Sequence, residues 1–129
     1  MDTARFAKLQ DVTNSDPEFC IAARFWHATL RLEMGEAALQ IRVVDGRIAE
    51  VLQRRPAIAL LTPANIIIAA PAAEWGKFLE PIPKPFYADL WSAAAHHGFT
   101  VGGDMETFYA YYPAIRRLMD ILRTLQHGA

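Results

Sequence analysis

The aromatic residues of this 129-residue chain are concentrated in one short stretch. Ten of the fourteen phenylalanine, tryptophan and tyrosine residues fall between Trp75 and Tyr112, within 38 residues. Helices that carry so many rings must bury them against another layer, because a large exposed apolar surface is unfavourable in water. The rest of the chain has to supply that layer, and its alternating segments predict a β-sheet.

Several segments with a hydrophobic period of two precede this stretch. The segment from Arg24 to Met34 is typical of a half-buried strand. Its inward face is predicted to carry Trp26, Ala28, Leu30, Leu32 and Met34. Residues 37–44 alternate in the same way, and Asp45-Gly46 predicts a type I′ hairpin into a third strand, Arg47 to Gln53. The β-branched run Ile66 to Ile68 predicts a fourth strand, buried more fully than the others, so the pattern indicates a meander of about four strands.

Proline and glycine mark the ends of the predicted helices. A short helix is expected from Pro17 to Ala22, since proline is favoured at the first helical position. Pro71 similarly begins a helix whose apolar face carries Trp75, Phe78 and Leu79. A further helix is predicted from Phe86 to His97, with Gly98 as its left-handed stop.

The last 31 residues predict a short strand and a long amphipathic helix. Residues 99–101 form the strand, and Asp104 is expected to cap the helix that follows. One stripe of this helix is apolar and consists of Met105, Phe108, Tyr112, Ile115, Leu118, Met119, Leu122 and Leu125. Pro113 predicts a kink or a restart, because proline removes one helical hydrogen bond and clashes with the preceding turn.

Composition predicts one ordered domain, 1–129, with 1–15 as a peripheral N-terminal segment. Apolar residues make up 53% of the chain and charged residues 21%, which argues against disorder, and a net charge of −1 without a basic run argues against nucleic-acid binding. The single cysteine, Cys20, and the absence of a signal peptide favour a cytoplasmic setting. The uncharged run from Pro56 to Ala73 contains internal prolines and is not expected to be an integral membrane segment.

No catalytic, metal or cofactor motif is recognised in the sequence. His27 has no carboxylate placed near it by spacing, which a general base would need. His96 and His97 are adjacent, so they point about 100° apart on a helix and cannot hold one metal as a pair. A phosphate site at Gly102-Gly103-Asp104 is disfavoured because the aspartate already occupies the cap.

The order of these elements predicts an α+β fold, and four groups of residues give it a family resemblance. They are Val44-Asp45-Gly46-Arg47, Ala73-Glu74-Trp75 with Phe78-Leu79, the connection from Pro81 to Asp89, and Phe99-Thr100-Val101-Gly102-Gly103-Asp104. Together, over about residues 20 to 126, they resemble the sterol carrier protein 2 (SCP2-like) domain family, and in particular a branch of small stand-alone bacterial proteins. The resemblance implies a twisted, mainly antiparallel sheet of about five strands, covered on one side by helices, with an apolar tunnel between the layers.

The function expected from these observations is non-enzymatic binding of a hydrophobic small molecule, such as a lipid, sterol or fatty acyl compound. The candidate ligand-binding residues are Trp75, Phe78, Phe86, Leu90, Trp91, Tyr112, Ile115, Met119 and Leu122. An ordinary filled core is the competing interpretation of these residues. Two other functions stay open: a small cofactor-free enzyme that uses His27 or Asp104 for proton transfer, and a homodimeric interaction module with exposed tyrosines.

Overall fold

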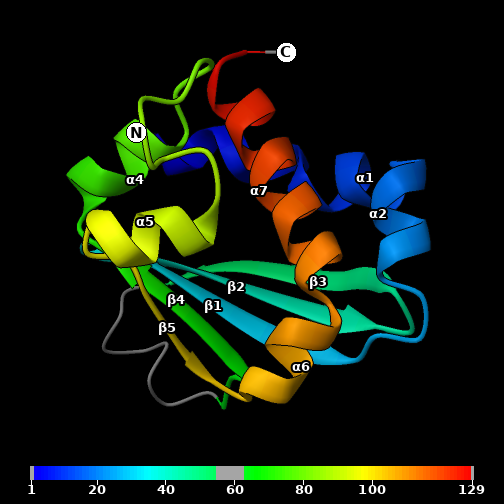
Figure 1. Cartoon of the computed structure of the whole chain (residues 1–129). Coiled ribbons are helices and arrows are strands. Elements are labelled where there is room, and N and C mark those ends of the chain that lie inside the picture. The colour runs from blue at the N-terminus through cyan, green and yellow to red at the C-terminus, as the bar shows by residue number, and fades with distance from the viewer. Residues whose placement is uncertain (1, 55–62, 129) are drawn as a thin grey trace.

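The computed structural model describes residues 2–54 and 63–128, and within them a twisted five-stranded sheet (Figure 1). The strands are β1 (Ala28–Met34), β2 (Ala37–Val44), β3 (Arg47–Arg54), β4 (Ile66–Ala70) and β5 (Thr100–Gly103). Their order in the sheet is β3-β2-β1-β4-β5, with β1 and β4 parallel and all other neighbours antiparallel. The predicted α+β class with a mainly antiparallel five-stranded sheet is therefore confirmed.

The position of β4 differs from the predicted meander. Only β1, β2 and β3 follow one another as hairpins, whereas β4 pairs in parallel with β1 on the opposite side from β2. A parallel pair requires a crossover between its strands, and hydrophobic periodicity carries no information on which strand will be the partner. The greater burial predicted for this strand was also wrong, because Ile66 and Ile68 are buried while Ile67 is only partly so.

The hairpin between β2 and β3 forms where Asp45-Gly46 predicted it. Both residues have positive φ, 50° and 76°, as a type I′ turn requires. The turn also lies against the chain that leads into β1, because the Gly46 amide donates to the Trp26 carbonyl at 2.9 Å. A side chain at Gly46 would come within 2.7 Å of the Ala23 carbonyl oxygen, so glycine is required there for space as well as for conformation.

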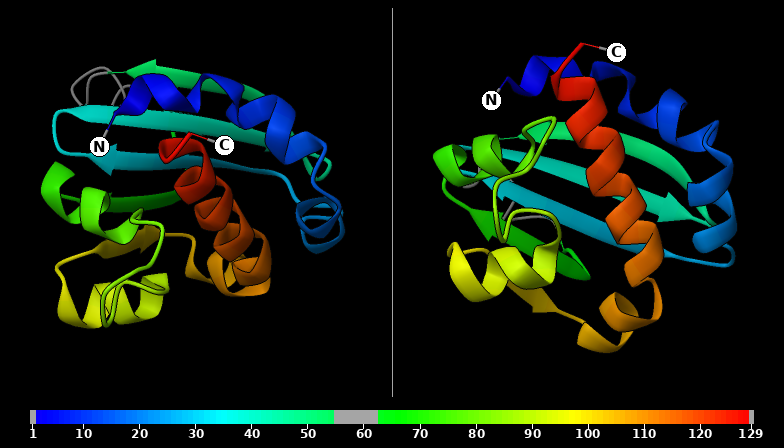
Figure 2. Two further views of the ribbon diagram at one scale, coloured as in Figure 1. Left: turned by 90° about the horizontal axis from the view of Figure 1, so that it is seen from above. Right: turned by 45° about the horizontal axis from the view of Figure 1, so that its top comes forward.

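The described helices lie on one face of the sheet (Figure 2). They are the 3₁₀ helix η1 (Thr3–Lys8) and the α-helices α1 (Leu9–Asn14), α2 (Pro17–Ala22), α4 (Ala72–Phe78), α5 (Leu90–His96), α6 (Met105–Ala110) and α7 (Tyr112–Gln126). Helix α7 runs across this face, with α1 and α2 on one side of it and α4 and α5 on the other. Within the described ranges no helix has both the length and the apolar character needed to cross a membrane.

Most helix boundaries follow the sequence signals, with one exception. Pro17 begins α2, Asp104 caps α6, and the final helix is interrupted at Tyr111, which leaves Pro113 in the first turn of α7 where its missing N–H is not needed. The helix predicted from Phe86 instead begins at Leu90. Phe86 has a φ of 68°, which lies outside the α-helical region, so the helix cannot begin there. The Asp89 carboxylate accepts a hydrogen bond from the Ser92 amide and is the N-terminal cap of α5.

The core lies between the sheet and the helices and includes residues from both ends of the chain. Phe6 and Leu9 are buried, so the N-terminal segment contributes side chains to this core. The predicted stripe of α7 is buried from Ile115 onward and belongs to the same hydrophobic core as the inward-facing residues of β1. Trp75 is fully buried and its indole Nε1 donates to the Glu33 carbonyl at 2.8 Å, which fixes α4 to the sheet.

A two-pronged ion pair joins α2 to α7. The Arg117 guanidinium donates to both carboxylate oxygens of Asp16, at 2.8 and 2.9 Å, while Asp16 also accepts from the Phe19 amide as the cap of α2. The hydrogen bond from Arg117 holds the pKa of Asp16 below its usual value, against a smaller opposing effect of burial. A group with a lowered folded-state pKa stabilises the protein above its unfolded pKa and loses that contribution as the pH falls.

We expect Asp16→Asn to lower the free energy of unfolding by about 1 kcal/mol at pH 7, since asparagine retains the cap but not the charge. The difference from the wild type should shrink as the pH falls below about 4, the unfolded pKa of aspartate. Urea denaturation of wild type, Asp16→Asn, Arg117→Gln and the double variant at pH 7 and pH 3 measures the pair. A difference that grows toward acid pH would contradict this assignment.

Candidate functional site

Two groups of aromatic rings lie on the helical side of the sheet. The inner ring cluster consists of Trp75, Phe78 and Phe99, whose centroids are 5.0 to 5.8 Å apart and which are all buried. The outer ring cluster joins α5 to α6 and α7 and contains Trp91, Phe108, Tyr109 and Tyr112. The helices predicted to be rich in rings therefore use them in two ways, one set in the interior and one at the edge.

The outer ring cluster is only partly covered. Trp91 and Tyr109 stack at 5.3 Å with an interplanar angle of 18°, and they are 41% and 59% exposed. Phe108 is fully buried beneath them and meets Trp91 edge to face at 5.6 Å. Tyr109 is exposed, whereas Tyr111 and Tyr112 are partly buried, because residues so close together on a helical path cannot all face inward. The cluster therefore extends from the protein surface, at Trp91 and Tyr109, to the buried Phe108, beside the break between α6 and α7.

The nine predicted ligand-binding residues are divided between core and surface. Buried members are Trp75, Phe78, Leu90, Ile115, Met119 and Leu122. Tyr112 is half-buried, Trp91 is at the edge, and Phe86 is 51% exposed because it projects from the connection between α4 and α5. The structure brings Trp75 together with Phe78, and Trp91 together with Tyr112, in the two ring clusters.

Some ring residues of this region were missed by sequence reasoning. Phe99 completes the inner cluster and Phe108 the outer one, although Phe108 already stood on the predicted apolar stripe. Tyr111 stacks on Trp26 at 5.1 Å, and its hydroxyl donates to the Arg24 carbonyl at 3.4 Å. The residue at the break between α6 and α7 is therefore attached to the loop that leads into β1. No local signal in the sequence indicates a contact over that separation.

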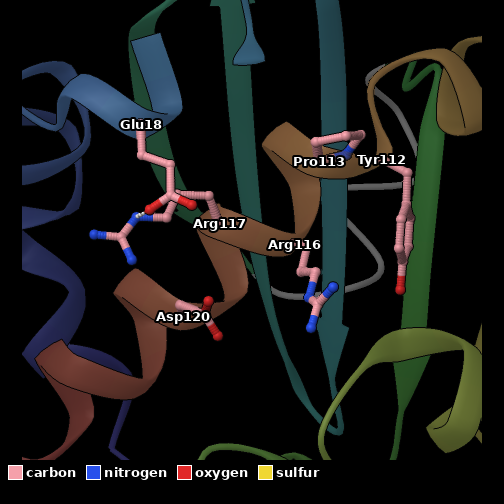
Figure 3. Close-up of a pocket in the computed structure, with 6 residues that line it drawn as sticks. All are labelled: Glu18, Tyr112, Pro113, Arg116, Arg117 and Asp120. Atoms are coloured by element: carbon pink, nitrogen blue, oxygen red, sulfur yellow. Dashed lines mark ion pairs between the residues drawn. The ribbon is translucent and has the colours of Figure 1, made fainter. Parts of the chain in front are cut away.

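A groove of about 330 Å³ runs along the outer side of α7 (Figure 3). Its lining residues are Glu18, Tyr112, Pro113, Arg116, Arg117 and Asp120. An open depression of about 550 Å³ lies near the turn between β1 and β2 and is lined by Asp2, Thr3, Met34, Glu36, Ala37 and Ala72. Both are partly polar, and of the nine predicted residues only Tyr112 lines either of them, so the apolar cavity stays a prediction.

The arginines of α7 differ in their partners. Arg117 pairs with Asp16 and lies 3.3 Å from a Glu18 oxygen, and Arg123 pairs with Asp120 at 2.9 Å and donates to the Phe78 carbonyl. Arg116 is exposed and has no ion pair or hydrogen bond with any described residue. It is therefore the cation of the groove that the described part of the chain leaves without a counter-ion.

The Tyr112 hydroxyl is buried without a hydrogen-bond partner among the described residues. Burial raises the pKa of this phenol, and the nearby Asp89 carboxylate adds to the effect. The backbone amides of Trp91 and Leu90, in the first turn of α5, act on this pKa in the opposite direction. A buried hydroxyl without an acceptor is costly, and such groups in native structures are few.

A second polar group fixes the connection between α4 and α5. The Tyr87 hydroxyl donates to Glu74 at 2.6 Å, which raises the pKa of Tyr87 to about 12 and lowers that of Glu74. His97 stacks on the Tyr87 ring at 3.6 Å, while His96 stacks on Phe86 at 3.9 Å. The two histidines thus serve separate ring contacts. Among the residues described, no group of three potential ligands is placed to hold a metal ion.

The residues considered for proton transfer have structural partners. His27 accepts the Asp45 amide through Nδ1 at 3.2 Å, at the β2–β3 turn. Asp104 accepts the amide and the hydroxyl of Thr107, at 3.1 and 2.7 Å, and these bonds lower its pKa. Neither residue lines the groove or the depression. Both side chains are thus already used in holding local backbone.

A mixed five-stranded sheet with one helical layer, crossed by a C-terminal amphipathic helix, defines the SCP2-like α+β fold. The chain is similar to the crystal structure of sterol carrier protein 2, with a TM-score of 0.76 and 18% identity over 93% of this chain and 94% of that one. The predicted fold is therefore confirmed over nearly the whole length.

Two other solved structures share this fold. A conserved hypothetical protein from Thermus thermophilus, described as possibly a sterol carrier protein, matches with a TM-score of 0.72 and 19% identity over 96% of this chain and 87% of that one. The UbiJ-SCP2 ubiquinone synthesis protein matches with a TM-score of 0.59 and 16% identity over 92% of each chain. No family model and no curated protein matches the sequence.

Proposed function

We propose that this protein binds a hydrophobic small molecule, a lipid, sterol or fatty acyl compound, between its sheet and its helical layer, without catalysing a reaction. The observation that carries the proposal is the outer ring cluster, which leads from solvent to the buried apolar stripe of α7 within an SCP2-like fold. Sterol carrier protein 2, which has this fold, is a carrier by its name.

The proposed entry route lies between α5 and the α6–α7 pair. Trp91 belongs to α5, whereas Phe108 and Tyr112 belong to α6 and α7, so separating these helices would open the outer ring cluster. The break at Tyr111 supplies a point at which α6 can turn relative to α7. Ile115 and Met119 are buried on the stripe of α7 that follows Tyr112 and would line the inner part of this route. Methionine adapts readily to guests of different shape.

Ligand binding is tested by native mass spectrometry of the purified protein, followed by extraction of whatever is retained. We expect an apolar compound to be released, and added long-chain acyl or polycyclic compounds to raise the melting temperature. A ligand at 100 times its Kd stabilises the folded state by about 2.7 kcal/mol.

The control for this experiment is a short-chain analogue with the same head group, which should give no shift. Absence of a retained compound, together with no shift for either ligand class, would refute the proposal. The same spectra count protomers, and so they also test the homodimeric alternative.

A further inference from the structure

We infer that the bound molecule carries an anionic head, which Arg116 and Tyr112 hold at the mouth of the route; this inference rests on the proposed function. Tyr112 and Arg116 are four residues apart, so they lie on the same side of α7. Figure 3 shows both side chains extending in the same direction from the helix, with the phenol oxygen and the guanidinium at their outer ends. Both residues line the groove along α7.

The cations on α7 are unequally paired. Arg117 and Arg123 are held by carboxylates at 2.8 and 2.9 Å, whereas Arg116 has no such partner in the described part of the chain. An arginine presents a planar fork of donors that matches carboxylate and phosphate oxygens. Arg116 lines the groove and is exposed, which leaves this fork available to a ligand.

The phenol of Tyr112 also lacks a partner among the described residues. The Tyr112 hydroxyl has one hydrogen to donate and no acceptor among the described residues. An anionic oxygen brought between it and Arg116 would satisfy this donor and supply the missing counter-ion together. A neutral apolar ligand would satisfy neither group.

The carboxylates that face this region are already engaged. Glu18 lies 3.3 Å from Arg117, Asp120 pairs with Arg123, and Asp89 caps α5 through the Ser92 amide. They reduce the positive potential of the groove, so a small free anion should gain little there. The binding energy of an apolar tail, added to the ion pair, favours an amphiphile over inorganic phosphate.

The placement of the neighbouring residues orients such a molecule. Ile115 and Met119 are buried, whereas Arg116 between them in sequence is exposed, so α7 changes from apolar to charged at this point. The head would lie in the 330 Å³ groove, and the tail would pass beneath Trp91 and Phe108 toward the core. The ligand class assigned by this geometry is an acidic amphiphile with one long apolar chain.

The test compares hexadecanoate with hexadecanol, which share a tail and differ in charge, using tryptophan fluorescence or calorimetry. Wild-type protein should bind the acid at least about tenfold more tightly, equivalent to about 1.4 kcal/mol. Arg116→Gln should remove that preference by weakening the acid alone, and Tyr112→Phe should reduce it in part. Arg42→Gln, which removes one exposed positive charge on β2, is the matched control and should behave as wild type.

The possible outcomes distinguish the head-group site, the proposed function and the class of ligand. Equal affinity for acid and alcohol in the wild type, or an acid preference that survives Arg116→Gln, would overturn the head-group site and leave the proposed function standing. Binding of neither compound would refute the proposed function itself. Stabilisation by inorganic phosphate alone, lost in Arg116→Gln, would assign the groove to a free anion and overturn the amphiphile.

Discussion

Replacing Trp75 by alanine is expected to lower the free energy of unfolding by about 4 kcal/mol, the range found for large buried aromatics. The side chain is fully buried, and its ring contacts Phe78 and Phe99 at centroid distances of 5.8 and 5.0 Å. Truncation would leave a void beneath α4 that the rigid sheet cannot close. It would also leave the Glu33 carbonyl without the indole N–H that it accepts at 2.8 Å.

Urea denaturation of three variants separates these contributions. Trp75→Phe keeps most of the ring but loses the hydrogen bond, so about 1 kcal/mol of its cost reflects that bond. Trp91→Ala removes the same residue type from a position that is 41% exposed and should cost much less. Equal losses for Trp75→Ala and Trp91→Ala would show that the inner ring cluster does not anchor α4.

Replacing Gly103 by alanine is expected to cost at least about 3 kcal/mol, because strain and collision act together. Gly103 ends β5 with a φ of +95°, a conformation that residues with a Cβ rarely adopt. A Cβ there would lie 2.1 Å from the Asn65 carbonyl oxygen, far inside contact distance. That same oxygen accepts the Asp104 amide at 2.7 Å, so moving it away would disturb the start of α6.

The neighbouring glycine provides the control. Gly102 does not have a positive φ, and a Cβ added to it would meet no described atom within 4 Å. Gly102→Ala should therefore change stability by less than about 1 kcal/mol. Thermal and urea unfolding of the two variants, purified in parallel, compare them directly. Similar stability of Gly102→Ala and Gly103→Ala would mean that β5 does not hold Gly103 in the described conformation.

Local rules account for the elements that the sequence predicted well. Alternation identified the inward face of β1, Asp45-Gly46 located the hairpin, and Pro113 located the break in the last helix. Each depends on residues within one turn or one strand, where backbone conformation and side-chain direction follow from the residue types themselves. Recognition of the SCP2-like fold rested on the order of such elements.

The errors arose where a distant contact decides the outcome. The pairing of β4 with β1 depends on a crossover, and the helix expected from Phe86 starts at Leu90 because the preceding segment is held by Glu74 and His97. The position of Phe86 at the surface follows from the same constraint. Periodicity could not have revealed these contacts, since their partners lie on other elements.

The sequence by itself determined which segments form strands and helices and which face of each is apolar, because these depend on short-range sterics and burial. Only the tertiary structure decided that Trp91 lies at an edge while Trp75 lies in the interior, and that Arg117 meets Asp16 while Arg116 meets no carboxylate of the described residues. Neighbouring residues of one type acquire different environments through elements that are remote in the chain. The physical reason is that burial and charge pairing are properties of assembled surfaces, which no single segment contains.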